Sequence, residues 1–288
     1  MTERWSARLQ AVQDHVRSHL DGDLSVDALT AIAGGSRFHV ARLFKEHTGE
    51  TLVQFVQRAR LERAATLMKA RPDRPLLDVA LQVGFKSASD FSRVFRQRHG
   101  IAPSRWDRRS RLSEGIPDYE DHLAAARDTC VPHVPRHVAL SAHRLACVRV
   151  ATPFFDNALL AEGYAELTGW FEAHGVDWRA LSLVGMSWDH PETTPLPQVR
   201  FDLGLSLPEG LEAGGALSEV SLPGGEAVAL RVQGSKACIA VAWKRLYRDV
   251  LPHADRDPAD LPAFKRFRSQ PCDTGWEVFD LDCLVALA

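Results

Sequence analysis

The sequence has none of the features that mark a membrane-bound or secreted protein. No run approaches the ~18 consecutive apolar residues of a membrane helix, and no apolar stretch follows Met1 as it would in a signal peptide. The five cysteines form no Cys-x-x-Cys pair, and their odd number does not suit a disulfide framework. We therefore expect reduced, scattered thiols in a cytoplasmic protein without a membrane partner.

The chain also lacks biased composition. Hydrophobic residues make up 45% and charged residues 25%, which excludes a disordered, collagenous or low-complexity protein. A length of 288 residues indicates about two domains.

Net charge is small as well, at −2, but it is unevenly distributed. Residues 1–111 hold 20 Lys+Arg against 12 Asp+Glu, whereas residues 112–288 hold 15 against 25. A basic region of this size favours a polyanionic partner, although many basic surfaces are only solvated. The chain therefore divides into a basic N-terminal part and an acidic C-terminal part.

The basic part contains an internal repeat at an offset of 51 residues, without a gap. The matched pairs are Asp27 and Asp78, Ser36 and Ser87, Arg42 and Arg93, Phe44 and Phe95, and Gly49 and Gly100. Each copy has the apolar spacing of two short helices separated by glycine, at Gly34-Gly35 and at Gly84. Ser36 and Ser87 are the expected N-caps of the second helices. This pattern is typical of a helix-turn-helix, so we expect an all-α double helix-turn-helix domain over residues 1–110.

The second helix of such a unit can lie in the major groove of DNA, where its outer face must supply hydrogen-bond donors and apolar tips. In the first copy the side chains expected there belong to Ser36, Arg37, Phe38, Ala41, Arg42 and Lys45. In the second copy they belong to Ser87, Ala88, Ser89, Ser92, Arg93 and Arg96. A solvated helix face is the alternative for one copy, but two copies in register on a basic domain favour DNA.

A third helical pattern links the two copies, from Thr51 to about Lys69, without Pro or Gly. Nineteen helical residues extend roughly 28 Å. Such a rod would let one chain reach successive major grooves, about 34 Å apart. Arg58, Arg60 and Arg63 on this helix are candidates for phosphate contacts or ordinary exposed charges.

Residues 6–109 resemble the DNA-binding domain of AraC/XylS-type regulators. The resemblance lies in the segments 36–49, 78–87 and 91–96, and in the closing segment 99–106, His-Gly-Ile-Ala-Pro-Ser-Arg-Trp. It implies that the chain reads promoter DNA with two helix-turn-helix units. Residues at the positions where the family contacts bases are Phe38, Ala41, Arg42, Ser89, Ser92 and Arg93. The second helix has few long donors apart from Arg93, which predicts weaker base readout and more phosphate positioning there.

Residues 111–137 change in character and are expected to be an interdomain linker with a short helix at 118–129. Cys130, His133 and His137 could in principle ligate a metal. Pro132 and Pro135 forbid a continuous helix there, and the triplet has no second cluster, so we expect neither a metal nor a cofactor.

The acidic part, residues 138–288, has a duplicated pattern of strand, helix, strand and strand that predicts an α+β domain. The expected elements are strands at 143–150, 181–188, 199–205, 226–232, 264–268 and 277–284, and helices at 157–174 and 236–251. Helices on one face of the sheet would leave a groove along the pseudo-twofold axis. Aromatic residues collect in this part and could line a small-molecule pocket or simply form core: Tyr164, Trp170, Trp188, Phe201, Trp243, Tyr247, Phe264 and Trp276.

This second part resembles the GyrI-like effector-binding domains of multidrug-responsive regulators. The resemblance rests on the segments 189–195, 200–204, 243–247 and 262–267, and the domain order is similar to that of Rob-type regulators. One position departs from the pattern. Lys265 stands where the resemblance leads us to expect an acidic residue, and a lysine in the pocket would favour neutral or anionic ligands over cationic drugs.

These observations predict a DNA-binding transcription regulator, not an enzyme, with promoter DNA and a small-molecule effector as partners. The acidic domain could also contact RNA polymerase. An alternative is a small-molecule hydrolase using Glu226, Tyr247 and Glu277, although no spacing of nucleophile and base supports it. A second alternative is an architectural DNA-binding protein whose acidic domain is purely structural.

Overall fold

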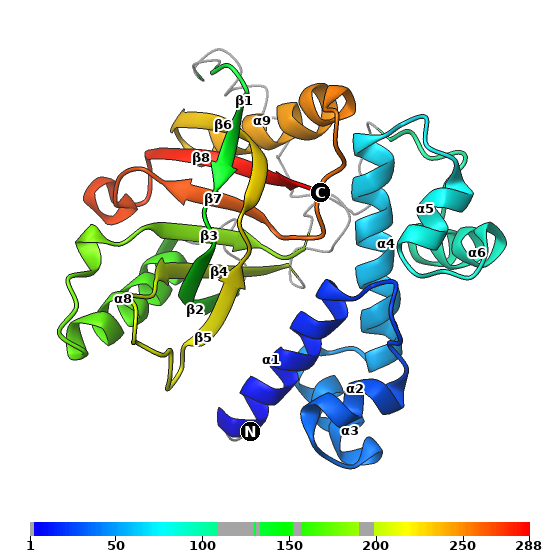
Figure 1. Ribbon diagram of the computed structural model, residues 1–288, viewed down its shortest axis with the longest axis horizontal. Coiled ribbons are helices and arrows are strands. Elements are labelled where there is room, and N and C mark those ends of the chain that lie inside the picture. Colours follow the sequence, from blue (N-terminus) through cyan, green and yellow to red (C-terminus); the bar gives the residue numbers. More distant parts are fainter. Residues whose placement is uncertain (1–2, 109–129, 131–132, 152–156, 190–198) are drawn as a thin grey trace. The chain divides into compact units, whose positions relative to one another are not determined.

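The computed structural model describes residues 3–108, 130, 133–151, 157–189 and 199–288. The chain forms two compact units, Met1–Leu112 and Ser113–Ala288 (Figure 1). Most of the expected linker at 111–137, including its helix at 118–129, lies outside the described residues. No helix within the described ranges is both long and apolar enough to cross a membrane.

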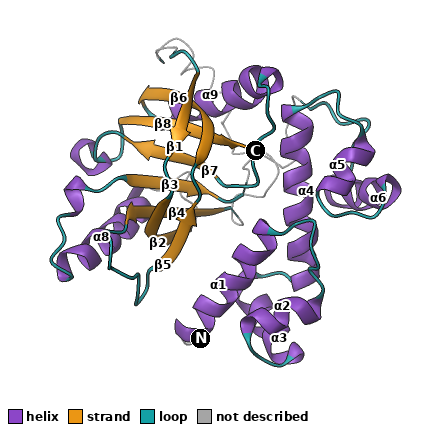
Figure 2. Cartoon of the chain, viewed as in Figure 1, coloured by secondary structure: helices purple, strands orange, loops and turns teal. Residues whose placement is uncertain are grey.

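The first unit is helical, as predicted (Figure 2). Its elements are α1 (Glu3–Ser18), α2 (Val26–Ala33), α3 (Arg37–Thr48), α4 (Leu52–Ala70), α5 (Leu76–Gln82) and α6 (Ala88–His99). The pairs α2–α3 and α5–α6 are the two repeated helix-turn-helix copies. Both copies and the 19-residue connecting helix α4 are therefore confirmed.

Helix α4 contributes to two separate hydrophobic cores. Its first half, including Phe55 and Ala59, packs with α1, α2 and α3. Its second half, including Leu61 and Leu67, packs with α5, α6 and the buried Trp106. Because one continuous helix belongs to both cores, it fixes the spacing of the two copies.

The turns of the two copies use glycine differently. Gly34 ends α2 in the left-handed region, at φ 67°, and its N–H donates to the carbonyls of Thr30 and Ala31. In the second copy the left-handed residue is Gly84, at φ 85°, where an added Cβ would lie 2.2 Å from the Leu20 carbonyl oxygen. Only glycine fits such an approach without a backbone shift.

The serine caps also differ from the expectation. Ser87 accepts a hydrogen bond from the Asp90 N–H, as an N-cap should. Ser36 occupies the predicted N-cap position of α3, but its hydroxyl makes no capping hydrogen bond. The predicted position is therefore right, and the predicted side-chain cap is wrong.

The second unit is built on an eight-stranded antiparallel sheet in the order β1-β6-β8-β7-β3-β4-β2-β5. The strands are β1 (Arg136–Leu140), β2 (His143–Ala151), β3 (Leu183–Ser187), β4 (Arg200–Ser206), β5 (Ser218–Leu222), β6 (Gly225–Gly234), β7 (Ala263–Phe267) and β8 (Phe279–Leu287). Strands β3 and β7 form the central pair. The order of the strands on either side of this pair has the predicted pseudo-twofold symmetry, which confirms the duplicated α+β pattern.

One helix follows the first strand of each half. These helices are α8 (Asn157–Ala173), after β2, and α9 (Lys236–Arg245), after β6. Gly163 of α8 lies against Val148 and Val150 of β2. Helix α9 is shorter than predicted: a π-helical turn, η3 (Leu246–Val250), and a 3-10 turn, η4 (Leu251–His253), continue it. Pro252 lacks a backbone N–H and cannot extend a regular α-helix.

Two of the sheet's strands were not predicted. β1 pairs only with β6, and β5 only with β2, so each lies at an edge. Their apolar residues, including Val138 and Val220, pack on a core that covers the sheet face opposite to α8. The remaining short helical turns are η1 (Trp178–Ala180) and η5 (Pro271–Thr274).

Candidate functional site

Helix α3 exposes the predicted recognition face. Phe38 near its N-terminus is 87% exposed, while Val40, Leu43 and Phe44 are buried in the first core. Arg42 is also exposed and pairs with Glu46 one turn later, with 3.0 Å between Nη1 and Oε1. A hydrophobic ring left in water beside a flexible arginine provides the two kinds of group that contact a base edge, an apolar tip and a donor.

The rest of the predicted set on α3 lies around these two residues. Ser36, Arg37 and Lys45 are exposed, and Ala41 is partly buried against the core. Arg37 lies 3.4 Å from an oxygen of Asp27 on α2, and both side chains are largely solvated. Such a pair is weak in water, so Arg37 can exchange its partner for a phosphate at little cost.

Helix α6 presents a more polar and more constrained face. Ser89, Arg93 and Arg96 are exposed, while Ser87, Ala88 and Ser92 are partly buried. The Arg93 guanidinium lies 2.5 Å from Oδ1 of Asp90, one turn earlier on the same helix. An open depression on this surface is lined by Ser92, Arg93, Arg96, Gln97 and Ala102.

Two arginines that the sequence offered as phosphate contacts serve the fold instead. Arg58 is buried, with 4% of its side chain exposed, and Arg60 donates from Nε to the Leu20 carbonyl at 2.9 Å. Burial lowers the pKa of Arg60, a shift that the charge of Asp21 opposes. Neither guanidinium faces solvent freely, so the expectation of phosphate contacts is wrong for these two residues.

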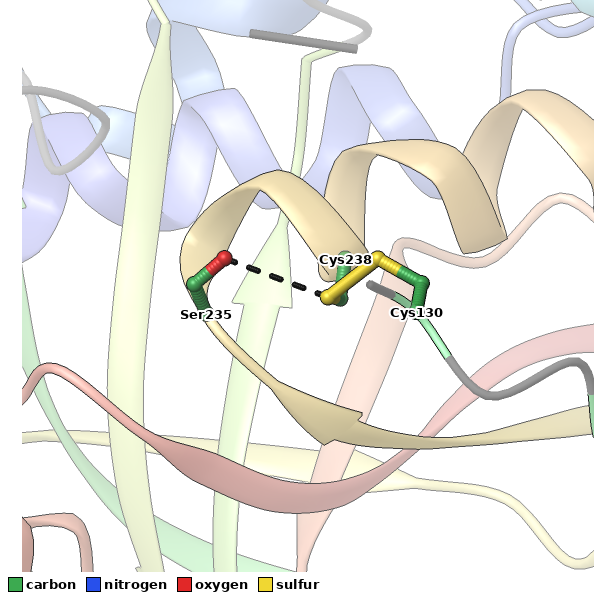
Figure 3. The surroundings of a disulfide bond; sticks show 3 residues. All are labelled: Cys130, Ser235 and Cys238. Atoms are coloured by element: carbon green, nitrogen blue, oxygen red, sulfur yellow. Dashed lines mark hydrogen bonds between the residues drawn. A yellow bond between two sulfur atoms is a disulfide. The ribbon is translucent and has the colours of Figure 1, made fainter. Parts of the chain in front are cut away.

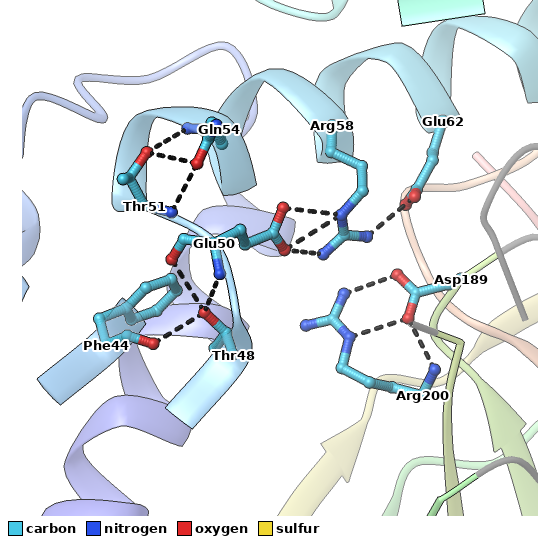
Figure 4. Close-up of polar contacts among 9 residues, drawn as sticks. All are labelled: Phe44, Thr48, Glu50, Thr51, Gln54, Arg58, Glu62, Asp189 and Arg200. Atoms are coloured by element: carbon cyan, nitrogen blue, oxygen red, sulfur yellow. Dashed lines mark hydrogen bonds and ion pairs between the residues drawn. The ribbon is translucent and has the colours of Figure 1, made fainter. Parts of the chain in front are cut away.

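Arg58 forms the centre of a buried ionic cluster on α4 (Figure 4). Its guanidinium lies 2.5 Å from Oε1 of Glu50 and 2.8 Å from Oε1 of Glu62. Thr51 caps the start of α4 in a capping box: its hydroxyl accepts from the Gln54 N–H, and the Gln54 side chain accepts from the Thr51 N–H. Because Glu50 directly follows the C-cap of α3, the cluster fastens the end of the recognition helix to the connecting helix. The sequence contained no signal for this burial, because Arg58 has the same residue type as Arg60 and Arg63 of this helix, which are only partly buried.

In the second unit, Lys265 lies at the middle of the sheet. It pairs in register with Gly185 of β3 on one side and with Cys283 of β8 on the other. Its Nζ lies 4.5 Å from the centroid of the Phe201 ring. Phe201 lies opposite Val150 on β2, and Val150 faces α8, so Lys265 and Phe201 share the helix-covered face.

The other predicted pocket residues lie in separate groups. Tyr164 contacts Trp276 edge-to-face and donates from its hydroxyl to Oε1 of Gln270, at 2.7 Å. Burial raises the pKa of the Tyr164 hydroxyl, and the Cys272 contact raises it further, so this hydroxyl stays protonated. Trp243 and Tyr247 lie next to each other at the end of α9, with ring centroids 6.2 Å apart.

For three of the predicted pocket residues, the described contacts are with residues other than Lys265. Trp170 packs against Phe171 and His174 on α8. Phe264 belongs to the core on the opposite face of the sheet, and Trp188 packs against that same core. The Trp188 Nε1–H donates to Oδ2 of the buried Asp202, at 2.6 Å. Their part in ligand binding stays a prediction.

Buried acids on that opposite face are a feature that the sequence analysis missed. Asp202 pairs with Arg149, and Asp282 accepts hydrogen bonds from arginines of β1, β7 and the segment after β7: Arg136, Arg266 and Arg268. In the register of the two halves, Arg149 opposes Asp202 and Arg231 opposes Asp282, but the Arg231 guanidinium pairs with Asp280 and not with Asp282. These ion pairs act in the architecture of the sheet.

The buried Asp189 lies just after β3 and holds Arg200 at the start of β4. The Asp189 carboxylate accepts hydrogen bonds from the Arg200 backbone N–H, Nε and Nη2, at 2.8, 2.8 and 2.6 Å (Figure 4). Residues 190–198, which include most of the predicted 189–195 segment, lie outside the described residues. The pair therefore fixes both ends of the segment that joins the two strands.

Two of the three candidate acid/base residues, Glu226 and Glu277, lie far apart. Glu226 begins β6, and its register partner Leu287 ends β8, whereas Glu277 precedes the start of β8. The two carboxylates are therefore separated by the length of β8, about 26 Å at the usual rise per residue. Glu226 pairs with Arg256, at 3.2 Å.

Cys130 and Cys238 form a disulfide, which corrects the expectation of unpaired thiols (Figure 3). Their Cα atoms are 5.5 Å apart across a sequence separation of 108 residues. Ser235, the residue before α9, donates to the Cys238 sulfur at 3.9 Å. Cys130 is thus engaged in a covalent bond, and no group of three potential metal-ligating side chains is found among the residues that the structure describes.

Fold and surface define a class: a double helix-turn-helix domain joined to an α+β domain. Two family models match the chain in this domain order. One describes a helix-turn-helix domain and matches residues 29–109, and the other describes a GyrI-like small molecule binding domain and matches residues 133–287. The chain belongs to the GyrI-like family and has the Rob-type arrangement of AraC/XylS regulators.

Curated relatives match about a third of the chain. The transcriptional regulator Rob of Salmonella typhimurium is 36% identical over 98 residues, which are 34% of this chain and 34% of that protein. The regulatory protein SoxS of Escherichia coli is 34% identical over 97 residues, covering 34% of this chain and 88% of that protein. The match with Rob thus spans about a third of that relative's length.

Among solved structures, the DNA-binding domain of AdpA in complex with a target DNA is similar to 34% of this chain and 86% of that chain. The identity is 28% and the TM-score is 0.32.

Proposed function

We propose that this protein is a transcription regulator that binds promoter DNA through α3 and α6 and senses a small molecule in its second unit. The observation that carries the proposal is the pair of helix-turn-helix copies on one continuous helix, each with an exposed arginine at the matched position. Because chromosomal DNA is the partner, we infer a cytoplasmic location.

The connecting helix supports binding by one chain to two groove segments. α4 has 19 residues and so extends roughly 28 Å. Successive major grooves on one side of a duplex are about 34 Å apart, which the two packed copies can span. We infer that α3 reads bases through Phe38 and Arg42, while α6 contributes Arg93 and contacts to phosphates.

The second unit supplies the sensing role in this proposal. An effector changes DNA affinity only if it binds two conformations of the protein with different affinity. Phe201 and Lys265 are the predicted ligand residues that the structure brings together on the helix-covered face. Since Glu226 and Glu277 lie at opposite ends of β8, we infer a binding domain and no hydrolase. Contact of this acidic unit with RNA polymerase is a further part of the proposal.

The test begins by recovering the recognition sequence from a pool of randomised duplexes with the full chain. Arg42→Ala and Arg93→Ala should each weaken binding to that sequence by ~1–3 kcal/mol in a gel-shift assay at fixed salt. Arg248→Ala is the matched control, because it removes an exposed, paired arginine from the second unit and should leave the shift unchanged. Unchanged affinity in both test variants would contradict the proposed use of α3 and α6.

A further inference from the structure

The surroundings of Lys265 identify a candidate ligand group. Strand alternation sends Phe264 into the core on one face of the sheet and Lys265 to the other. On that face its register neighbours are Gly185, which has no side chain, and the buried Cys283. The side chain still keeps partial solvent exposure. An ammonium thus lies at the centre of the domain, at the junction of its two halves.

One aromatic ring contacts this ammonium, and a second lies close by. The Phe201 ring lies beneath it, and an added Cβ at Gly185 would meet the Phe201 Cζ at 2.6 Å. Phe201 therefore fills the room that the missing side chain of Gly185 leaves. Phe267, two residues after Lys265, lies 3.4 Å from the same Cβ position and contacts Phe279. The Lys265 ammonium therefore lies against a flat apolar ring, with a second ring nearby.

The charges near Lys265 do not favour a cationic ligand. Burial lowers the pKa of Lys265 to about 8, the Cys283 thiol opposes this shift, and Lys236 at the start of α9 adds to it. Burial raises the pKa of Cys283 to about 12, so this neighbour is a neutral thiol. The buried acids Asp202 and Asp282 follow Phe201 and precede Cys283, so they point to the opposite face of the sheet.

We propose that the effector is a small aromatic anion whose carboxylate pairs with Lys265 and whose ring packs against the apolar groups around this lysine. This inference rests on the sensing role proposed above and names its ligand class. An anion gains a charge-assisted hydrogen bond in apolar surroundings, where such a bond is stronger than in water. A cation would be repelled by both Lys265 and Lys236, and a neutral ring gains only the packing.

Three probes of one shape test the charge preference with the full chain: 2-naphthoate, 2-naphthamide and 2-naphthylmethylammonium. Titration calorimetry should show naphthoate binding at least about tenfold tighter than the amide, with the cation weakest, as expected for one charge-assisted hydrogen bond. Lys265→Met should reduce naphthoate to the affinity of the amide. Lys86→Met, which removes an exposed lysine from the first unit, should retain the full preference.

The pH dependence gives a second readout that loss of folding would not mimic. Lys265 is charged below its pKa, so naphthoate affinity should fall as the pH rises from about 7 to about 9. Among the described residues, Cys283 on β8 and Lys236 on α9 act on its charge, while its register neighbour on β3 is Gly185 and the β4 residue beneath it is Phe201. Lys265→Arg should keep the preference for naphthoate but lose this pH dependence, because arginine stays charged.

Equal affinity for the three probes, or an unchanged preference in Lys265→Met, would overturn the assignment. Failure of all three probes to bind a chain that still selects a duplex from the random pool would also overturn it, while leaving the DNA-binding function standing. If the chain binds naphthoate through Lys265 but selects no duplex, the ligand class holds and the proposed regulator function fails.

Discussion

The two helix-turn-helix copies have the same spacing and different chemistry. At matched positions, Phe38 of α3 corresponds to Ser89 of α6, and Lys45 corresponds to Arg96. Phe38 projects into solvent, whereas the N-terminus of α6 carries an acidic residue, Asp90, that holds Arg93. A repeated backbone thus carries one copy suited to base contact and one copy suited to positioning on phosphates.

The copies are also fastened to the connecting helix by different means. After α3 the chain continues through Glu50, which reaches the buried Arg58. At the matched position after α6 stands Ile101, which packs against the second core together with Trp106. One copy is therefore held by an ionic cluster and the other by apolar packing.

The largest expected effect comes from breaking the ionic cluster. Arg58→Ala should lower the free energy of unfolding by ~3–5 kcal/mol, because it leaves the carboxylates of Glu50 and Glu62 without their shared cation in a buried place. Urea unfolding of the full chain, followed by circular dichroism, measures this. Arg248→Ala, which opens an exposed pair, should change stability by less than about 1 kcal/mol. A comparably small effect in Arg58→Ala would show that the cluster does not stabilise the first copy.

A smaller effect should distinguish the two turns. Gly84→Ala should cost at least about 2 kcal/mol, because the new Cβ meets the Leu20 carbonyl in addition to the left-handed strain. Gly34→Ala, where the nearest atom is 3.7 Å away on the flexible Arg8 side chain, should cost about 1–2 kcal/mol from backbone strain alone. Thermal unfolding of both variants gives the comparison, and equal losses would remove the distinction between the turns.

The smallest effect concerns the recognition faces and should appear in DNA affinity alone. Phe38→Ala should weaken binding to the selected duplex by ~1 kcal/mol, whereas Ser89→Ala at the matched position should change it by less than about half of that. Neither variant should alter the melting temperature, because both side chains are exposed. A larger loss in Ser89→Ala than in Phe38→Ala would reverse the roles assigned to α3 and α6.

Local patterns predicted the regular elements of this chain well. The 51-residue offset and the apolar spacing identified α2 to α6, and the duplicated strand pattern identified six of the sheet's strands within a few residues. β1 and β5 were missed because each pairs on one side only, so neither has the buried pattern of an inner strand such as β3. Register and edge pairing depend on contacts between distant segments, which a local pattern does not contain.

The same limit explains the errors among single residues. Arg58 shares a helix and a residue type with Arg60 and Arg63, which are only partly buried, and its full burial depends on how α4 packs against the rest of the first unit. Phe264 and Lys265 are neighbours in the chain, but strand alternation separates them onto opposite faces. The pairing of Cys130 with Cys238 required the fold, because 108 residues separate them.

The disulfide closes residues 130–238 of the second unit into a covalent ring. All described strands from β1 to β6 lie between Cys130 and Cys238, and Ser235 lies beside the closing bond. A protease that cuts any exposed turn inside this ring would leave one molecule on a gel without reductant and two fragments after reduction.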